Sequence, residues 1–164
     1  MTRTLTAILE LRRAGRVQRC HGIPYHGSYS VAEHTYQMLN LLMSLCPKPS
    51  KALIEAILYH DSAELEIGDT PRPAKTRFPD LGKAVAKAEE VVNSELSVMQ
   101  DKLLPSELAW LRGLDLLELA MWCLDQLDMG NKNVMPVLDR CHDAIQEQEM
   151  PEEIREFLKL GVLR

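Results

Sequence analysis

The chain has 164 residues, of which 46% are hydrophobic and 26% are charged, and its formal net charge at pH 7 is −5. This composition is typical of a folded globular protein, and the length suits a single domain, residues 1–164, around one core. The acidic balance provides no basic surface for nucleic acid or for an anionic membrane, so we expect neither as a partner.

The cysteines and the N-terminal residues indicate the cellular compartment. The four cysteines are widely spaced and form no CxxC pair, so we interpret them as reduced thiols. The N-terminal apolar run is too short for a signal peptide, and no stretch approaches ~18 uninterrupted apolar residues. We therefore expect a soluble cytoplasmic protein.

Apolar residues recur at spacings of three and four along nearly the whole chain, and no alternating run is long enough to suggest a sheet. This pattern predicts an all-α fold, a bundle of about seven helices. Ser30 with Glu33 has the spacing of a capping box, Ser50 can cap the third helix, and Pro105 and Pro151 suit a first turn. The predicted helices span residues 3–14, 30–46, 50–67, 80–102, 105–128, 133–148 and 151–162.

Two polar segments interrupt the helical pattern. Residues 14–29, AGRVQRCHGIPYHGSY, contain three glycines, two histidines and two arginines. Residues 68–80, GDTPRPAKTRFPD, contain three prolines and three basic residues. Because long polar loops are unusual in a small helical domain, both segments are candidate functional surfaces.

The helical projection of residues 50–67 places ionisable side chains on the face that packs. At 100° per residue, His60 and Glu64 fall opposite a polar stripe, and Asp61 lies about 60° to one side of them. A buried carboxylate must be paired, protonated or bound to a metal. The stripe that we expect to face solvent consists of Lys51, Glu55, Ser62 and Glu66.

The helix predicted at 30–46 has the same anomaly, because His34 shares its sector with Val31, Met38 and other apolar residues. One such histidine alone is more often a satisfied core residue than a ligand. Two of them with Asp61 and Glu64 nearby favour a catalytic site for a divalent transition metal, since such sites mix nitrogen and oxygen ligands and leave positions open. These ligands suit Zn, Co or Mn, and also Fe or Ni.

The helix predicted at 105–128 is apolar almost all round, so we expect it to lie centrally. Asp115 shares a sector with apolar residues, which would bury it. Glu118 and Asp125 flank that sector, which would instead make it a solvated edge. The helical projection leaves both positions of Asp115 open.

Four of these residues resemble the ligand pattern of the HD superfamily of metal-dependent phosphohydrolases: a lone His, an adjacent His-Asp pair and a distant Asp. The longer stretch YHDSAELEIGDTPRPAK is similar to the YfbR-type 5'-deoxynucleotidases. The resemblance extends from about residue 8 to 130 and implies an HD-domain fold. The positions that match the metal ligands are His34, His60, Asp61 and Asp115.

The resemblance also implies roles for residues in and next to the two polar loops. Glu64 and Asp69 match the catalytic acidic pair, while Arg19 and Lys75 match the residues that contact substrate. Cys20 departs from the bacterial pattern, which has a tryptophan directly after the arginine.

The compact length and the pairing of HGIP with TPRPAK are similar to small phage-encoded relatives that act on dATP. In that group, residues at the positions of Ile23 and Pro73 line the base pocket. Arg72 and Arg77 lie in the same loop, either to reach further phosphates or as solvated loop charges.

The resemblance implies a metal-dependent phosphohydrolase that acts on deoxynucleotides in nucleotide-pool control, and our leading hypothesis is hydrolysis of dATP to deoxynucleoside and triphosphate. One alternative is a 5'-deoxynucleotidase that releases phosphate from dNMPs. The other is a non-catalytic helical protein that binds metal and nucleotide. Since relatives assemble and the C-terminal helix is mostly apolar, we expect a homo-oligomer in the cytoplasm, or in the host cytoplasm if a phage encodes it.

Overall fold

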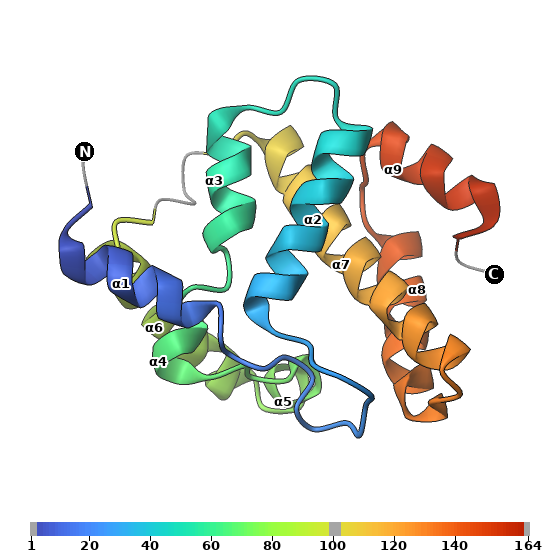
Figure 1. The fold of residues 1–164 in the computed structure, drawn as a ribbon, viewed down its shortest axis with the longest axis horizontal. Coiled ribbons are helices and arrows are strands. Elements are labelled where there is room, and N and C mark those ends of the chain that lie inside the picture. The colour runs from blue at the N-terminus through green and yellow to red at the C-terminus, as the bar shows by residue number, and fades with distance from the viewer. Residues whose placement is uncertain (1–2, 99–102, 163–164) are drawn as a thin grey trace.

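The computed structural model describes residues 3–98 and 103–162, and every regular element in these ranges is a helix. The predicted all-α fold class is therefore confirmed. None of the described helices is long and apolar enough to cross a membrane. Figure 1 shows three helices at the centre of the molecule: α2 (Val31–Leu45), α3 (Lys51–Tyr59) and α7 (Pro105–Asp128).

The other elements flank this centre on two sides (Figure 1). The N-terminal side holds α1 (Leu5–Ala14), α4 (Glu64–Ile67), α5 (Arg72–Arg77) and α6 (Pro79–Glu95). The C-terminal side holds a 3-10 turn (Lys132–Val134), α8 (Met135–Glu147), α9 (Glu152–Phe157) and a π-helical turn (Leu158–Val162).

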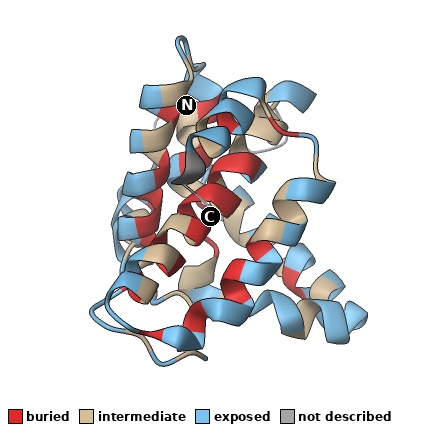
Figure 2. Cartoon of the chain, turned by 90° about the vertical axis from the view of Figure 1, so that its right-hand side faces the viewer, coloured by how far each residue is buried: buried red, intermediate tan, exposed pale blue. Residues whose placement is uncertain are grey.

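The hydrophobic core lies where α2 and α3 pack against α7. In Figure 2 the buried residues run through the interior helices, and the outer turns are exposed. α7 is apolar on most sides because it meets α2 and α3 on one flank and α8 on the other, which explains its almost continuous apolar sequence. Fully buried core residues include Met38, Leu42, Ile57, Leu114, Leu117 and Ala120.

Three helices start at the predicted signals. The Ser50 side chain caps α3, and Pro105 begins α7. At the start of α2, Ser30 Oγ accepts a hydrogen bond from the Glu33 backbone N–H (3.3 Å), whereas the Glu33 carboxylate accepts from Ser28 Oγ (3.2 Å). The capping serine of the predicted box is thus present, and its glutamate secures the preceding loop instead.

The prediction of one continuous helix over residues 50–67 is wrong at its centre. α3 ends at Tyr59, and α4 begins at Glu64 after a tight turn. Ser62 Oγ donates to the Tyr59 carbonyl (2.7 Å) and lies 3.3 Å from Asn93 Oδ1, so Ser62 is 4% exposed rather than part of the solvated stripe. A serine hydroxyl that binds nearby backbone competes with helical hydrogen bonding, which explains the break.

Other boundaries differ in smaller ways. The predicted loop 68–80 contains α5, and the predicted helix 133–148 begins with a 3-10 turn. The helix predicted over 80–102 starts at Pro79 and ends at Glu95, and residues 99–102 lie outside the described ranges. The separate helices α4 and α5 bring the number of α-helices in the described ranges to nine.

α9 is held against α7 by Ile154, which is 0% exposed. A Cβ atom on Gly113 would lie 2.8 Å from Ile154 Cδ1, so the two helices approach as closely as glycine permits. We expect Ile154→Ala to lower the free energy of unfolding by about 2–4 kcal/mol, because it leaves a cavity. Leu160→Ala, at a side chain 77% exposed, should change it by less than about 0.5 kcal/mol. Urea denaturation measures both, and equal effects would contradict this anchoring role.

Candidate metal centre and active site

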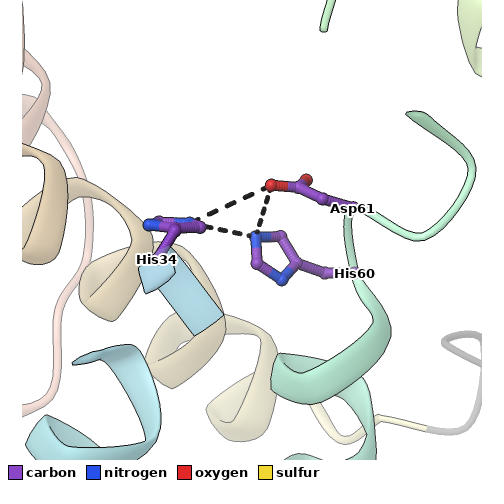
Figure 3. Close-up of side chains that lie close together, drawn as sticks. All are labelled: His34, His60 and Asp61. Carbon is purple, nitrogen blue, oxygen red and sulfur yellow. Dashed lines mark hydrogen bonds and ion pairs between the residues drawn. The ribbon is translucent and has the colours of Figure 1, made fainter. Parts of the chain in front are cut away.

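Three of the predicted ligand residues meet where α2 approaches the end of α3 (Figure 3). His34 Nε2 lies 3.3 Å from His60 Nε2 and 4.0 Å from Asp61 Oδ2, and His60 Nε2 lies 3.2 Å from Asp61 Oδ2. One ligand atom from each residue falls within 4.8 Å of the others. This group can therefore hold a metal ion.

Both histidines present Nε2 to this cluster because Nδ1 is engaged elsewhere. His60 Nδ1 lies 2.8 Å from the Ile57 carbonyl, which can only accept, so this nitrogen carries the proton. His34 Nδ1 contacts the Glu118 carboxylate. Two imidazole nitrogens beside a carboxylate form a donor set that fits a divalent transition metal.

Asp115 lies at the same site, which decides the question that its helical projection left open. Its Oδ1 is 3.2 Å from His34 Nε2 and 3.5 Å from Arg19 Nη2. A second carboxylate thus stands beside the cluster of His34, His60 and Asp61. Burial by itself would raise the pKa of Asp115, but neighbouring positive charges, Arg19 among them, hold it below its ordinary value.

Arg19 reaches this site from the loop between α1 and α2 and forms an ion pair with Asp61. Burial alone would lower the pKa of Arg19, but the Asp61 carboxylate raises it above its ordinary value, so the guanidinium stays charged. Burial would likewise raise the pKa of Asp61, yet His60 and Arg19 hold it well below its usual range. The site therefore combines ionised carboxylates with a fixed cationic fork.

Glu64 is the first residue of α4, one turn after His60. Its Oε2 is buried and has no hydrogen-bond partner among the described residues. Burial and the charge of Asp61 raise the pKa of Glu64 to about 8. A carboxyl group with a pKa near neutrality can both accept and donate a proton at physiological pH.

Asp69 joins the two polar loops. It accepts a hydrogen bond from the Cys20 backbone N–H (2.9 Å), and its Oδ2 lies 3.7 Å from His21 Nδ1. Cys20 itself has a left-handed backbone, with φ of 53°. Asp69 therefore fixes the loop residue that follows Arg19.

The whole chain can now be compared with known proteins. A family model described as "5'-deoxynucleotidase YfbR-like" matches residues 7–162. The chain belongs to this YfbR-like family. A 5'-deoxynucleotidase of Yersinia pseudotuberculosis is 27% identical over 109 residues, which cover 58% of this chain and 55% of that protein. A 5'-deoxynucleotidase of Vibrio atlanticus is 22% identical over 165 residues, covering 87% of this chain and 85% of that protein. The chain thus spans about half the length of the Yersinia relative.

Two solved structures share the fold of this YfbR-like chain. The HD phosphohydrolase DatZ of cyanophage S-2L, bound to dA and one catalytic Zn²⁺ ion, has a TM-score of 0.70 at 19% identity, covering 99% of this chain and 95% of that one. The PH0347 protein of Pyrococcus horikoshii has a TM-score of 0.72 at 24% identity, covering 97% and 98%. These likenesses confirm the HD-domain fold.

The described contacts of three other residues that were predicted to bind substrate lie outside the cluster. Lys75, on α5, lies 3.6 Å from Glu89 of α6, so its described ion pair is with that helix. Pro73 is exposed on α5, and Ile23 is half-buried against the core.

Sequence reasoning missed the role of Glu118, which it treated only as the mark of a solvated edge. In this YfbR-like chain Glu118 is 5% exposed and contacts both His34 Nδ1 and the Tyr29 hydroxyl. Its spacing of three residues from Asp115 was the available signal, because residues three apart share one face of a helix.

Two buried amides secure the loop that carries Arg19. Gln126 accepts from the His26 N–H (2.8 Å) and donates to the His26 carbonyl (2.9 Å). Asn131 donates to the Pro24 carbonyl (2.9 Å). The loop is therefore anchored to the end of α7 as well as to Asp69.

Proposed function

We propose that this YfbR-like protein is a metal-dependent phosphohydrolase that cleaves the 5' phosphoester bond of a deoxynucleotide. The observation that carries the proposal is the cluster of His34, His60 and Asp61 with the Arg19 guanidinium against it. The family description and the curated relatives, which are named 5'-deoxynucleotidases, support this reaction class. The phosphohydrolase of cyanophage S-2L, bound to dA and zinc, supports it as well.

The donor set indicates which residues would hold the metal. His34, His60 and Asp61 are joined by Asp115, whose Oδ1 lies beside His34 Nε2. Zn, Co or Mn suits these nitrogen and oxygen ligands. When bound, such an ion supplies Lewis acidity toward a phosphate oxygen and lowers the pKa of water.

Acidic side chains of the protein carry out the proton transfers of the proposed reaction. Glu64, with its unpartnered buried Oε2, accepts a proton from the attacking water as the water oxygen bonds to phosphorus. The bond between phosphorus and the 5' oxygen breaks, and the leaving oxygen takes up a proton. Asp69 helps to position the nucleophile or to supply that proton, and it also holds the backbone beside Arg19.

Basic residues bind the phosphate chain of the substrate in this proposal. Arg19 offers a bidentate fork, and Lys75 offers a point charge once it exchanges the Glu89 carboxylate for phosphate. Arg72 and Arg77 are exposed on the same short helix as Lys75 and can neutralise further phosphates. This basic helix favours a multiply charged substrate, and Ile23 and Pro73 at the proposed base pocket favour dATP among such substrates.

Two loop residues complete the proposed substrate site, with Ile23 and Pro73 lining the pocket for the base. We further propose that residues 1–164 form one domain and that the protein acts as a homo-oligomer in the cytoplasm. The second candidate reaction, release of phosphate from dNMPs, is favoured by the family description.

The substrate assignment predicts a defined pair of products. We expect the zinc-, cobalt- or manganese-loaded protein to convert dATP to deoxyadenosine and triphosphate, because water attacks the phosphorus next to the 5' oxygen. Incubation with dATP, dAMP and the other dNTPs, followed by mass identification of products, measures this. Orthophosphate released only from monophosphates would instead establish the 5'-deoxynucleotidase. Binding of metal and nucleotide without turnover would establish the non-catalytic alternative.

A further inference from the structure

The ring nitrogen of His34 that points away from the cluster, Nδ1, contacts the buried carboxylate of Glu118. Glu118 lies on α7, one turn after Asp115, and contacts His34 Nδ1. The Tyr29 hydroxyl donates to Glu118 Oε2 over 2.6 Å. His34 and Tyr29 are both 0% exposed, so these contacts are shielded from solvent.

The hydrogen bonds to Glu118 define which nitrogen of His34 faces the cluster. An ionised carboxylate only accepts hydrogen bonds, so Nδ1 donates to Glu118 and Nε2 is the nitrogen that remains for the metal. Nε2 lies on the side of the cluster, 3.3 Å from His60 Nε2 and 3.2 Å from Asp115 Oδ1. A buried carboxylate left without donors would be costly, so Tyr29 and His34 also satisfy Glu118.

Tyr29 is itself held on several sides. Its ring stacks on Trp122 with centroids 4.3 Å apart and an interplanar angle of 14°. Arg19 Cζ lies 5.6 Å from the ring centroid, and the Tyr29 carbonyl accepts from the Arg19 N–H over 2.8 Å. Tyr29 therefore links the loop that carries Arg19 to the support beneath His34.

We propose that Glu118 and Tyr29 are positioning residues that hold His34 with Nε2 toward the metal and so strengthen metal binding. The carboxylate fixes the tautomer and orientation of the imidazole and makes Nε2 a stronger donor, and the tyrosine hydroxyl holds the carboxylate in place. This inference rests on the proposed function only in taking the cluster as a metal site.

The test measures zinc affinity without nucleotide, by competition with a chromogenic chelator. We expect Glu118→Gln to weaken zinc binding about 10- to 100-fold, because the charge that polarises His34 is lost. Tyr29→Phe keeps the ring and removes one hydrogen bond, so we expect a loss of about three- to tenfold. Asp125→Asn, an exposed carboxylate of the same helix, is the matched control and should bind zinc like the wild type.

Circular dichroism establishes whether each variant is folded. Folded Glu118→Gln and Tyr29→Phe proteins with zinc affinity within twofold of the wild type would overturn the proposal. Should Glu118→Gln fail to fold, nitrogen-15 spectra of the zinc-loaded wild type still decide it: we expect the His34 ring proton on Nδ1, and ligation through Nδ1 would overturn it. Wild-type zinc binding without nucleotide turnover would refute the proposed function while leaving this inference intact.

Discussion

Replacing Asp61 by alanine is expected to remove both zinc binding and nucleotide hydrolysis. The Asp61 carboxylate lies 3.2 Å from His60 Nε2 and forms an ion pair with Arg19, so the variant loses a proposed ligand and leaves a buried cation without that partner. We expect kcat/KM to fall by at least ~10³, because a metal ion contributes several kcal/mol to the stabilisation of the transition state. Initial rates and atomic emission of the purified protein measure the two effects.

Asp80→Ala provides the control for this experiment. The Asp80 side chain is 99% exposed at the start of α6, so its removal should leave zinc content and rate unchanged. Circular dichroism verifies that both variants keep their helices. An Asp61→Ala protein that retains full zinc and full activity would show that the metal is bound elsewhere.

Glu64→Gln is expected to separate metal binding from catalysis. Glutamine has almost the same shape but cannot take up the proton of the attacking water, so we expect kcat to fall about 10²- to 10⁴-fold. Zinc affinity should stay near that of the wild type, because Glu64 is not among the proposed ligands. Steady-state kinetics and chelator competition on the same preparation give both values.

Glu66→Gln is the matched control, since Glu66 lies on the same short helix and is exposed. It should turn over substrate like the wild type. If Glu64→Gln instead kept the wild-type kcat, another group would have to take the proton from water.

Periodic spacing predicted the inward position of His34 and His60 because α2 and α3 each bury one continuous face. The same spacing wrongly extended the predicted helix through residues 60–63, where no glycine or proline indicates a break. The break is associated with the hydrogen bond from Ser62 to the Tyr59 carbonyl and with the contact of Ser62 with Asn93 on α6. Local competition of this kind depends on tertiary partners that a helical projection does not contain.

The sequence predicted site residues whose type and spacing suit a metal. It was less informative about residues whose position depends on a side chain from another part of the chain. Asp115 remained open because Glu118 and Asp125, which flank its sector, were equally consistent with a solvated edge. In the structure, Glu118 is buried and contacts His34. The face of α7 that carries Asp115 and Glu118 therefore lines the site. For Lys75, the sequence predicted a contact with substrate but not its ion pair with Glu89. That pair depends on how α5 packs against α6.

The amide anchors of the Arg19 loop also constrain the order in which the chain folds. The contacts of His26 with Gln126 and of Pro24 with Asn131 join residues 100 and 107 positions apart, whereas His34 and His60 are 26 apart. Contacts between distant residues form more slowly because more chain entropy is lost in closing them. During synthesis the two histidines emerge from the ribosome long before Asn131 does. In a nascent chain, His34 and His60 can therefore come into contact before the loop that bears Arg19 is anchored to the end of α7.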